Sequence, residues 1–350
     1  MLFLNFTKLF MKNILISLFS AVLLTSCATV NYSYEGRAFK NSLQSITQDD
    51  LKKNLYVIAS DEMEGRNTGS AGQKKAGEYI IQQYREMGVS HPKPMSSYYQ
   101  NVPAEFMNAK SRGKSLPDSE NILAFIEGSE KPDEIIVISA HYDHVGTQNG
   151  VVYNGADDDG SGTVAVMKIA EAFQNAKKAG HGPKRSMLFL HVTGEEHGLL
   201  GSDYYSQNPV FPLANTVSNL NIDMIGRCDP ENCGKDYVYV IGSAMLSSEL
   251  KKINEEANSK TAKMFLNYKY DQPNDPQRLY YRSDHYNFAK HNIPVAFFFD
   301  GIHEDYHKPT DDADKIDYDA LQKRTQLVFA TAWELANRKE RIVVDGKNDR

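Results

Sequence analysis

The chain has 350 residues and a formal net charge of −6, with 41% apolar and 24% charged residues. This length allows one large domain or two small ones, and the composition is typical of a globular protein with a real core. A mildly acidic chain without a basic run gives no reason to propose a nucleic-acid partner. The net charge does not indicate which substrate the protein binds.

The N-terminal residues are typical of an export signal. Two lysines precede the apolar run ILISLFSAVLL, which is too short to span a bilayer but fits the core of a signal peptide. The tripeptide Leu-Thr-Ser before Cys27 resembles the bacterial lipobox, in which the cysteine becomes the first mature residue and carries lipids. We expect a lipoprotein signal peptide over residues 1–26 and a lipid anchor on Cys27 in the cell envelope, periplasmic or at the outer membrane. The alternative is an ordinary signal peptide with an incidental cysteine.

Two further cysteines occur, Cys228 and Cys233. If Cys27 is lipidated, they form an even pair in an oxidising compartment, so a disulfide across the CDPENC loop is expected. Two free thiols on a surface loop are the alternative. The spacing does not suit a zinc site, and no second cysteine pair is available.

Helical and strand patterns alternate from Thr47 onward, after a polar tether over residues 27–45. Amphipathic or capped helices are predicted to begin near Thr47 and to cover residues 71–88, 161–180 and 318–337. Short β-rich runs are predicted as strands at residues 122–128, 134–143, 186–194, 219–226, 237–242 and 295–301. The alternation favours a three-layer α/β/α sandwich around a mixed, mostly parallel sheet. One domain is expected over residues 46–340, followed by a tail at 341–350.

Polar side chains follow the predicted strands, where each apolar run ends. They are His141 and Asp143, Glu195 and Glu196, Asp223, and finally His303, Glu304 and His307. Ligands of open α/β sheets bind at the carboxyl ends of the strands, so these residues are expected to converge on one edge. Imidazole and carboxylate groups suit zinc and tolerate cobalt or manganese. Two ions bridged by one carboxylate would need a further carboxylate as general base, and adjacent glutamates offer one of each.

Five motifs in order resemble the co-catalytic zinc exopeptidases, which include bacterial leucyl-type aminopeptidases and glutamate carboxypeptidase. The motifs are AHYDHVG from Ala140, NGADDDGSG from Asn154, GEEHGLLGS from Gly194, NIDMIG from Asn221 and YHKPTDD from Tyr306. The upstream SDEMEGRNTGSAG also resembles secreted members, so the resemblance covers roughly residues 45–337. It implies a three-layer zinc-exopeptidase fold and an aminopeptidase with two zinc ions that acts on peptide or protein N-termini.

The resemblance also assigns roles to individual residues. It implies that His141 and Asp223 hold one zinc, that Glu196 and His307 hold the other, and that Asp158 bridges them. It further implies a cis peptide bond after the bridging aspartate, at Asp158–Asp159.

Three more residues receive roles by position in the motifs. Glu195 is the expected general base, and Asp143 is expected to orient the ring of His141 from behind. Tyr306 resembles a tyrosine that helps to stabilise the tetrahedral intermediate in some members. The remaining histidines of the motif regions are interpreted as ordinary core or surface residues: His144, His191, His197, His285 and His303.

Alternative functions have distinct signatures. The sequence from His303 to His307 is literally HExxH, but a single-zinc protease needs that motif on a helix, and Pro309 follows closely. Glutaminyl cyclases share the fold but depart from the pattern at the positions of His141 and Asp223. A carboxypeptidase would need a cation for the terminal carboxylate, for which Arg227 and Arg282 are candidates.

Two alternatives remain open for the site as a whole. A non-catalytic binding module is the alternative of another class, and it would not depend on Glu195. Tyr280, Tyr281 and the run from Phe297 to Phe299 could form an apolar side-chain pocket or belong to the core.

Overall fold

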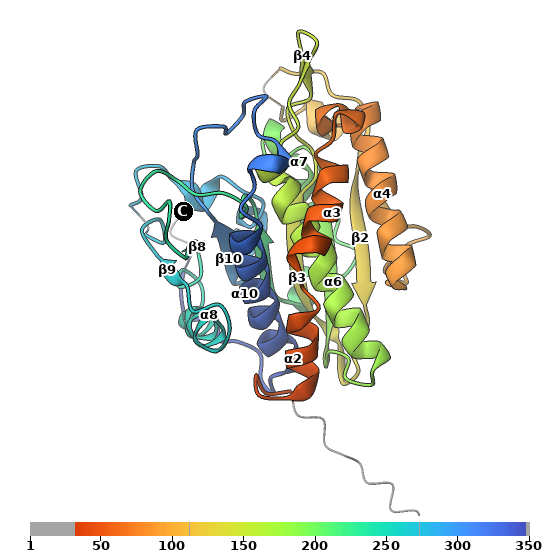
Figure 1. The fold of residues 1–350 in the computed structure, drawn as a ribbon. Coiled ribbons are helices and arrows are strands. Elements are labelled where there is room, and N and C mark those ends of the chain that lie inside the picture. The colour runs from red at the N-terminus through yellow and green to blue at the C-terminus, as the bar shows by residue number, and fades with distance from the viewer. Residues whose placement is uncertain (1–31, 112, 273, 348–350) are drawn as a thin grey trace, which may run out of the picture. The chain divides into compact units, whose positions relative to one another are not determined.

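The computed structural model describes residues 32–111, 113–272 and 274–347, and the predicted signal peptide and Cys27 lie outside this part. Its main feature is an eight-stranded sheet in the order β1-β2-β6-β3-β7-β10-β8-β9 (Figure 1). The strands are β1 (Tyr99–Val102), β2 (Ser119–Ile126), β3 (Lys131–His141), β6 (Arg185–Val192), β7 (Thr216–Ile222), β8 (Tyr237–Ile241), β9 (Phe265–Asn267) and β10 (Val295–Phe299). A separate two-stranded ribbon joins β4 (Thr147–Gln148) and β5 (Val151–Val152).

The four central strands β6, β3, β7 and β10 are mutually parallel neighbours. The flanking strands β2 and β8 run antiparallel to them, so the sheet is mixed, as predicted. Because parallel strands end on the same edge, the segments that follow these four strands meet there.

Helices cover both faces of the sheet. The longer ones are α2 (Arg37–Gln44), α3 (Gln48–Ile58), α4 (Ala71–Met87), α6 (Gly162–Lys178), α7 (Leu200–Gln207), α8 (Ser248–Lys260) and α10 (Tyr318–Asn337), and two short ones are α5 (Ala104–Asn108) and α9 (Tyr286–Ala289). Helices α2, α3, α4, α6 and α10 share one apolar core with the sheet, and α7 and α9 contribute to the core on the other face. The predicted three-layer α/β/α sandwich is confirmed.

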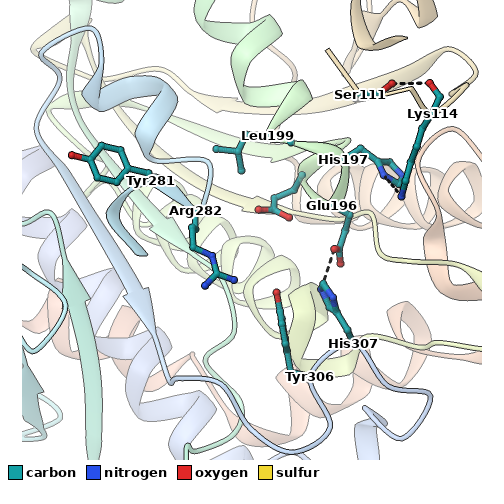
Figure 2. A pocket seen from close by; sticks show the side chains of 11 residues that line it. Ser111, Lys114, Glu196, His197, Leu199, Tyr281, Arg282, Tyr306 and His307 are labelled. Atoms are coloured by element: carbon teal, nitrogen blue, oxygen red, sulfur yellow. Dashed lines mark hydrogen bonds and ion pairs between the residues drawn. The ribbon is translucent and has the colours of Figure 1, made fainter. Parts of the chain in front are cut away.

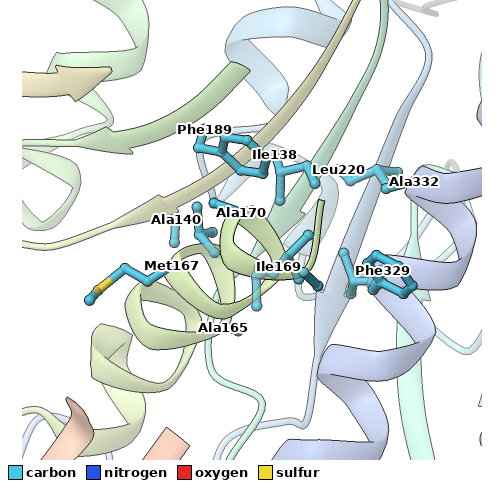
Figure 3. Close-up of a cluster of buried hydrophobic side chains, with 14 of the residues drawn as sticks. Ile138, Ala140, Ala165, Met167, Ile169, Ala170, Phe189, Leu220, Phe329 and Ala332 are labelled. Carbon is cyan, nitrogen blue, oxygen red and sulfur yellow. The ribbon is translucent and has the colours of Figure 1, made fainter. Parts of the chain in front are cut away.

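The strand residues alternate between the two cores. In β3, Ile136, Ile138 and Ala140 pack under α6 and α10, whereas Ile135 and Val137 face the opposite side. Figure 3 shows Ile138 and Ala140 among side chains of α6 and α10. Both faces of β3 are therefore covered by apolar groups, which explains the continuous apolar run in its sequence.

Local sequence signals determine where the predicted helices begin and end. The Thr47 hydroxyl accepts a hydrogen bond from the Asp50 N–H at the start of α3, and Ser70 caps α4 in the same way. Helix α4 ends at Gly88, whose φ of 76° favours glycine. The predicted helices at 71–88, 161–180 and 318–337 are confirmed within two residues.

Both ends of the described chain differ from the prediction. Residues 37–44 form helix α2, and Phe39 packs on Phe329 and Trp333 of α10, so this part of the expected tether belongs to the domain. In the expected tail, Asp345 accepts hydrogen bonds from the backbone and hydroxyl of Ser248 at the start of α8. Because these contacts join residues far apart in the chain, no local sequence pattern predicts them. No helix in the described part is long and apolar enough to cross a membrane.

Candidate metal centre

The predicted ligands meet at the carboxyl edge of the four parallel strands. His141 is the last residue of β3, and Asp223 directly follows β7. Glu196 lies in a short helical turn after β6, and His307 lies in the loop after β10. Asp158 comes from the segment Ala156–Ser161 before α6, and the predicted cis peptide bond at Asp158–Asp159 is present.

The first set of ligands is His141, Asp158 and Asp223, here called the inner group. The Nε2 atom of His141 lies 3.1 Å from Asp158 Oδ1 and 3.6 Å from Asp223 Oδ1. Only 1% of the His141 side chain, 4% of Asp158 and 11% of Asp223 is exposed. Ligands of a tetrahedral zinc with bonds of about 2.0 Å lie about 3.3 Å apart, so these separations fit one ion.

The second set is Asp158, Glu196 and His307, here called the outer group. The Nε2 atom of His307 lies 3.0 Å from Asp158 Oδ2 and 3.0 Å from Glu196 Oε2. The His307 side chain is 39% exposed, so this group opens toward solvent. Asp158 therefore directs one oxygen to each histidine, as a bridging carboxylate must.

His144 also belongs to the cluster, contrary to its interpretation from the sequence as an ordinary core or surface histidine. Its ring is fully buried, with Nδ1 2.8 Å from Glu196 Oε1 and 3.8 Å from Asp158 Oδ2. Gly155 leaves space for the ring, because a Cβ atom there would lie 2.5 Å from its carbons. The only signal in the sequence was the position of His144, three residues after His141 in the same strand-end motif.

Several buried polar atoms of the cluster lie close to one another but make no hydrogen bond of good geometry among the described residues. They are His141 Nε2, both ring nitrogens of His144, Asp158 Oδ2 and Glu196 Oε1. Buried polar groups in proteins are nearly always satisfied, and leaving them unpaired is costly. Imidazole nitrogens and carboxylate oxygens gathered at one point are the ligand set that a divalent metal requires. The residues present therefore fit a metal centre.

Neighbouring groups fix the orientation of the inner ligands. His141 Nδ1 lies 3.0 Å from the backbone carbonyl of Asp143, which leaves Nε2 for the metal. The predicted role of Asp143 thus falls to its main chain, since its carboxylate is 3.7 Å from the ring. That carboxylate instead accepts hydrogen bonds from Thr68 and from the Glu195 N–H. Asp223 accepts a hydrogen bond of 2.6 Å from Ser283.

The bridging segment is held from both sides. The carboxylate of Asp311 accepts hydrogen bonds from the backbone N–H groups of Asp157 and Asp158. Asp159 accepts from the N–H groups of His141, Gly162 and Met224, so its oxygens serve the backbone although they lie near the inner group.

Arg66, from the upstream motif SDEMEGRNTGSAG, holds together the segments that carry His141 and Asp158. Its buried guanidinium donates to the carbonyls of Tyr142, Ile58, Asn154 and Gly155. This one side chain ties the segment after β3 to the segment before α6, and nothing in the sequence indicated its burial.

Glu195 precedes the ligand Glu196 and lines a cavity of about 590 Å³ that opens beside the outer group. Burial raises the pKa of its carboxyl well above the ordinary value, and the charges of Asp223 and Glu196 raise it further, against the opposing effect of His141. A carboxylate with a raised pKa accepts a proton readily, which suits a general base.

Tyr306 lines the same cavity. Its ring stacks on His307 with 3.9 Å between centroids, and burial raises the pKa of its hydroxyl, which stays protonated. A protonated hydroxyl at this place can donate a hydrogen bond.

The HExxH alternative fails on geometry. Residues 303–307 form turns rather than a helix, and His307 has a φ of 55°. His303 contacts Asp157 at 3.2 Å, whereas His307 contacts Asp158 and Glu196. The two histidines therefore do not share one ion.

The curated proteins that are similar to this chain include the following two. A probable leucine aminopeptidase from Arthroderma otae is 28% identical over 298 residues, which are 83% of this chain and 77% of the relative. A probable zinc metalloprotease from Pyricularia oryzae is 27% identical over 282 residues, which are 67% of this chain but 53% of the relative. The chain thus spans about half the length of the second protein.

Solved structures share the fold. A zinc aminopeptidase from Bacillus subtilis aligns with a TM-score of 0.64 at 17% identity, over 86% of this chain and 99% of its own. A glutaminyl cyclase from Bacteroides thetaiotaomicron aligns with a TM-score of 0.65 at 18% identity, over 84% of this chain and 99% of its own. These likenesses establish the architecture of the sheet and its helices.

The family model described as Peptidase family M28 matches residues 121–332. This range is more than half of the 350 residues and contains every residue of the inner and outer groups. By the order of its motifs, the geometry of its strand-end cluster and this match, the chain belongs to peptidase family M28.

Proposed function

We propose that this chain is a zinc-dependent aminopeptidase that holds two zinc ions and removes N-terminal residues with apolar side chains. The observation that carries the proposal is the position of a small pocket directly beside the metal centre. Its lining includes carboxylates of the centre, Asp158, Glu195 and Asp223, together with the apolar side chains Met224, Leu279, Phe297, Phe299 and Ile302.

The two kinds of lining match the two parts of a free N-terminal residue. An α-ammonium group pairs with carboxylates, for which Asp223 and Glu195 are in place. The apolar wall accepts a hydrocarbon side chain. Phe297 and Phe299 are thus pocket residues, whereas Phe298 lies in the core on the other face of the sheet.

The residues of the chain have separable tasks in peptide hydrolysis. Bound zinc supplies a Lewis acid for the scissile carbonyl and lowers the pKa of water. Glu195, with its raised pKa, takes a proton from the attacking water on its carboxylate and returns it to the leaving amine. The protonated hydroxyl of Tyr306 donates a hydrogen bond to the oxyanion that develops from the carbonyl oxygen.

Two arginines near the site differ in whether they could bind a substrate carboxylate. Arg227 forms an ion pair of 2.9 Å with Asp305 and is not available for a substrate carboxylate. Arg282 is exposed and lines both the small pocket and the wide cavity next to it. The direction of hydrolysis therefore needs a direct test.

The test is mass spectrometry of a pentapeptide with an N-terminal leucine, supplied free and N-acetylated, after incubation with the zinc-loaded chain. Stepwise loss from the N-terminus of the free peptide, with the acetylated peptide intact, is the expected result. Loss of C-terminal residues from both peptides would contradict the proposed direction and would establish a carboxypeptidase on the same metal centre. Loss of ammonia from a peptide with N-terminal glutamine would establish a cyclase.

We also propose that lipid on Cys27 anchors the chain in the cell envelope. Support comes from the apolar run and the Leu-Thr-Ser-Cys27 sequence, together with the expectation that Cys228 and Cys233, which are bonded in the structure, meet an oxidising compartment. Metabolic labelling with radioactive palmitate is expected to mark the wild-type chain and not the Cys27→Ser variant. Equal labelling of both chains would contradict the anchor.

A further inference from the structure

A second, wider cavity adjoins the small pocket at the metal centre. Its volume is about 590 Å³, and it shares Glu195, Arg282 and Tyr306 with the small pocket. This volume lies within the range of cavities that bind small ligands. If the first residue of a peptide occupies the small pocket, the residues after the scissile bond must lie in the wide cavity. Side chains on the far wall of this cavity would therefore contact the part of the substrate that lies after the scissile bond.

The far wall is formed by a loop that follows α5 and presents Lys114. Asn108 holds the base of this loop, because its side chain accepts a hydrogen bond from the Leu116 N–H at 2.7 Å and donates one to the Leu116 carbonyl at 3.0 Å. The Ser111 hydroxyl donates to the Lys114 carbonyl at 2.7 Å, which fixes Lys114 relative to Ser111. Ser111 and Lys114 both line the cavity.

The ammonium of Lys114 is held at the cavity by His197. Lys114 Nζ lies 3.2 Å from His197 Nδ1, and His197 Nε2 lies 3.2 Å from Asn67 Oδ1. Because an ammonium can only donate, Nδ1 must accept, and Nε2 carries the proton that is donated to Asn67. The contact uses one of the three ammonium donors, and His197 in this neutral form does not neutralise the charge of Lys114.

The charge of Lys114 is not neutralised by any carboxylate of the described residues. In contrast, Lys110 of the same loop forms an ion pair with Asp203. Figure 2 shows Lys114 and His197 on one side of the cavity and Tyr281 and Arg282 on the other, with Glu196 and His307 between them. Among the described residues, His197 is the one hydrogen-bond partner of the Lys114 ammonium, and Lys114 thus presents a cation to the space that the leaving part of a peptide would occupy.

We propose that Lys114 is a specificity-determining residue that binds a carboxylate on the leaving side of the peptide. The carboxylate is either the C-terminus of a short peptide or the side chain of an aspartate or glutamate after the scissile bond. The proposal rests on the proposed aminopeptidase activity and names its substrate class. Lys114 lies outside the region 121–332 that the family model matches.

The test compares kcat/KM of the full-length, zinc-loaded chain on four tripeptides. Leu-Ala-Ala as the free acid and as the amide isolates the terminal carboxylate. Leu-Glu-Ala amide and Leu-Gln-Ala amide isolate an acidic side chain. The wild-type chain is expected to prefer the carboxylate form in at least one of the two pairs by about three- to tenfold, and less at high salt. The pair that shows the preference identifies the source of the carboxylate.

Variants assign the preference to Lys114. The ratio within the preferred pair is expected to fall to about one in Lys114→Ala and to invert in Lys114→Glu, because the cation is removed or replaced by an anion. Lys114→Arg is expected to keep most of it. Lys110→Ala is the matched control, since Lys110 pairs with Asp203 and does not line the cavity, and it is expected to keep the wild-type ratio.

Three outcomes would overturn the proposal. The first is a wild-type ratio of one in both pairs with normal cleavage of all four peptides. The second is an unchanged ratio in Lys114→Ala, and the third is a preference that survives in Lys114→Ala but disappears in Arg282→Gln, which would assign it to Arg282. Failure to cleave any peptide would contradict the proposed aminopeptidase activity itself, and is therefore distinct from these three.

Discussion

The inner and outer groups of the metal centre share Asp158 but differ in how the chain holds them. His141 ends β3 and Asp223 follows β7, so the inner group stands on the sheet, and at most 11% of any of its side chains is exposed. Glu196 and His307 come from turns, and 39% of the His307 side chain is exposed. The comparison teaches that one ligand set is preorganised by the core and the other by loops.

The supporting contacts differ in the same way. In the inner group, Asp143 orients His141 and Ser283 orients Asp223, and both contacts are buried. In the outer group, Glu196 is flanked by His144, and His307 stacks on Tyr306, which itself lines the cavity. If two zinc ions bind as proposed, we expect the inner group to hold its ion more tightly and the more exposed outer group to exchange its ion more readily.

The change with the largest expected effect removes the residue that both groups share. Asp158→Ala deletes one oxygen from each group, so neither ion is expected to stay bound through dialysis, and activity should fall to that of the metal-free chain. Zinc content by plasma mass spectrometry checks this, with thermal unfolding in metal-free buffer as the control for folding. Retention of one full equivalent of zinc would show that Asp158 serves a single group.

The next effect separates proton transfer from metal binding. Glu195→Gln removes the base but no ligand, so kcat is expected to fall by about 10²–10⁴-fold while the zinc content stays at the wild-type value. Steady-state kinetics and zinc analysis of the same preparation provide both readings. Full activity in this variant would mean that another residue is the base.

The smallest expected effect concerns His144 and sharpens the comparison. His144→Ala removes the ring beside Glu196 Oε1, and loss of such an outer partner typically weakens metal binding about 10- to 100-fold. We expect this loss at the weaker of two zinc-binding events only, with His144→Asn recovering part of it. The check is a competition titration against a chelator of known affinity. An effect on the tighter event instead would place His144 with the inner group.

Much of the fold could be predicted because its signals are local. Buried parallel strands leave continuous apolar runs, as in β3 and β6, and the capping residues Thr47 and Gly88 mark helix ends. Helix α2 was missed because its apolar side depends on Phe39 meeting α10, almost three hundred residues later in the chain.

The same distinction applies to the site, where some residues are recognisable from the local sequence and others are not. The strand-end position of His141, Glu195, Glu196 and Asp223 is visible in the sequence, since each follows an apolar run. The roles of His144 and Arg66 are not, because a lone histidine and a loop arginine look alike whether buried or exposed. Their functions arise from contacts between segments that only the folded sheet brings together.

Calorimetric titration of the metal-free chain with zinc tests the central claim most directly, when wild type is compared with His307→Ala. The account predicts two binding events of unequal affinity in the wild type and loss of only the weaker event in the variant, because His307 belongs to the exposed outer group. A single event, two equal events, or loss of the tighter event in His307→Ala would contradict it.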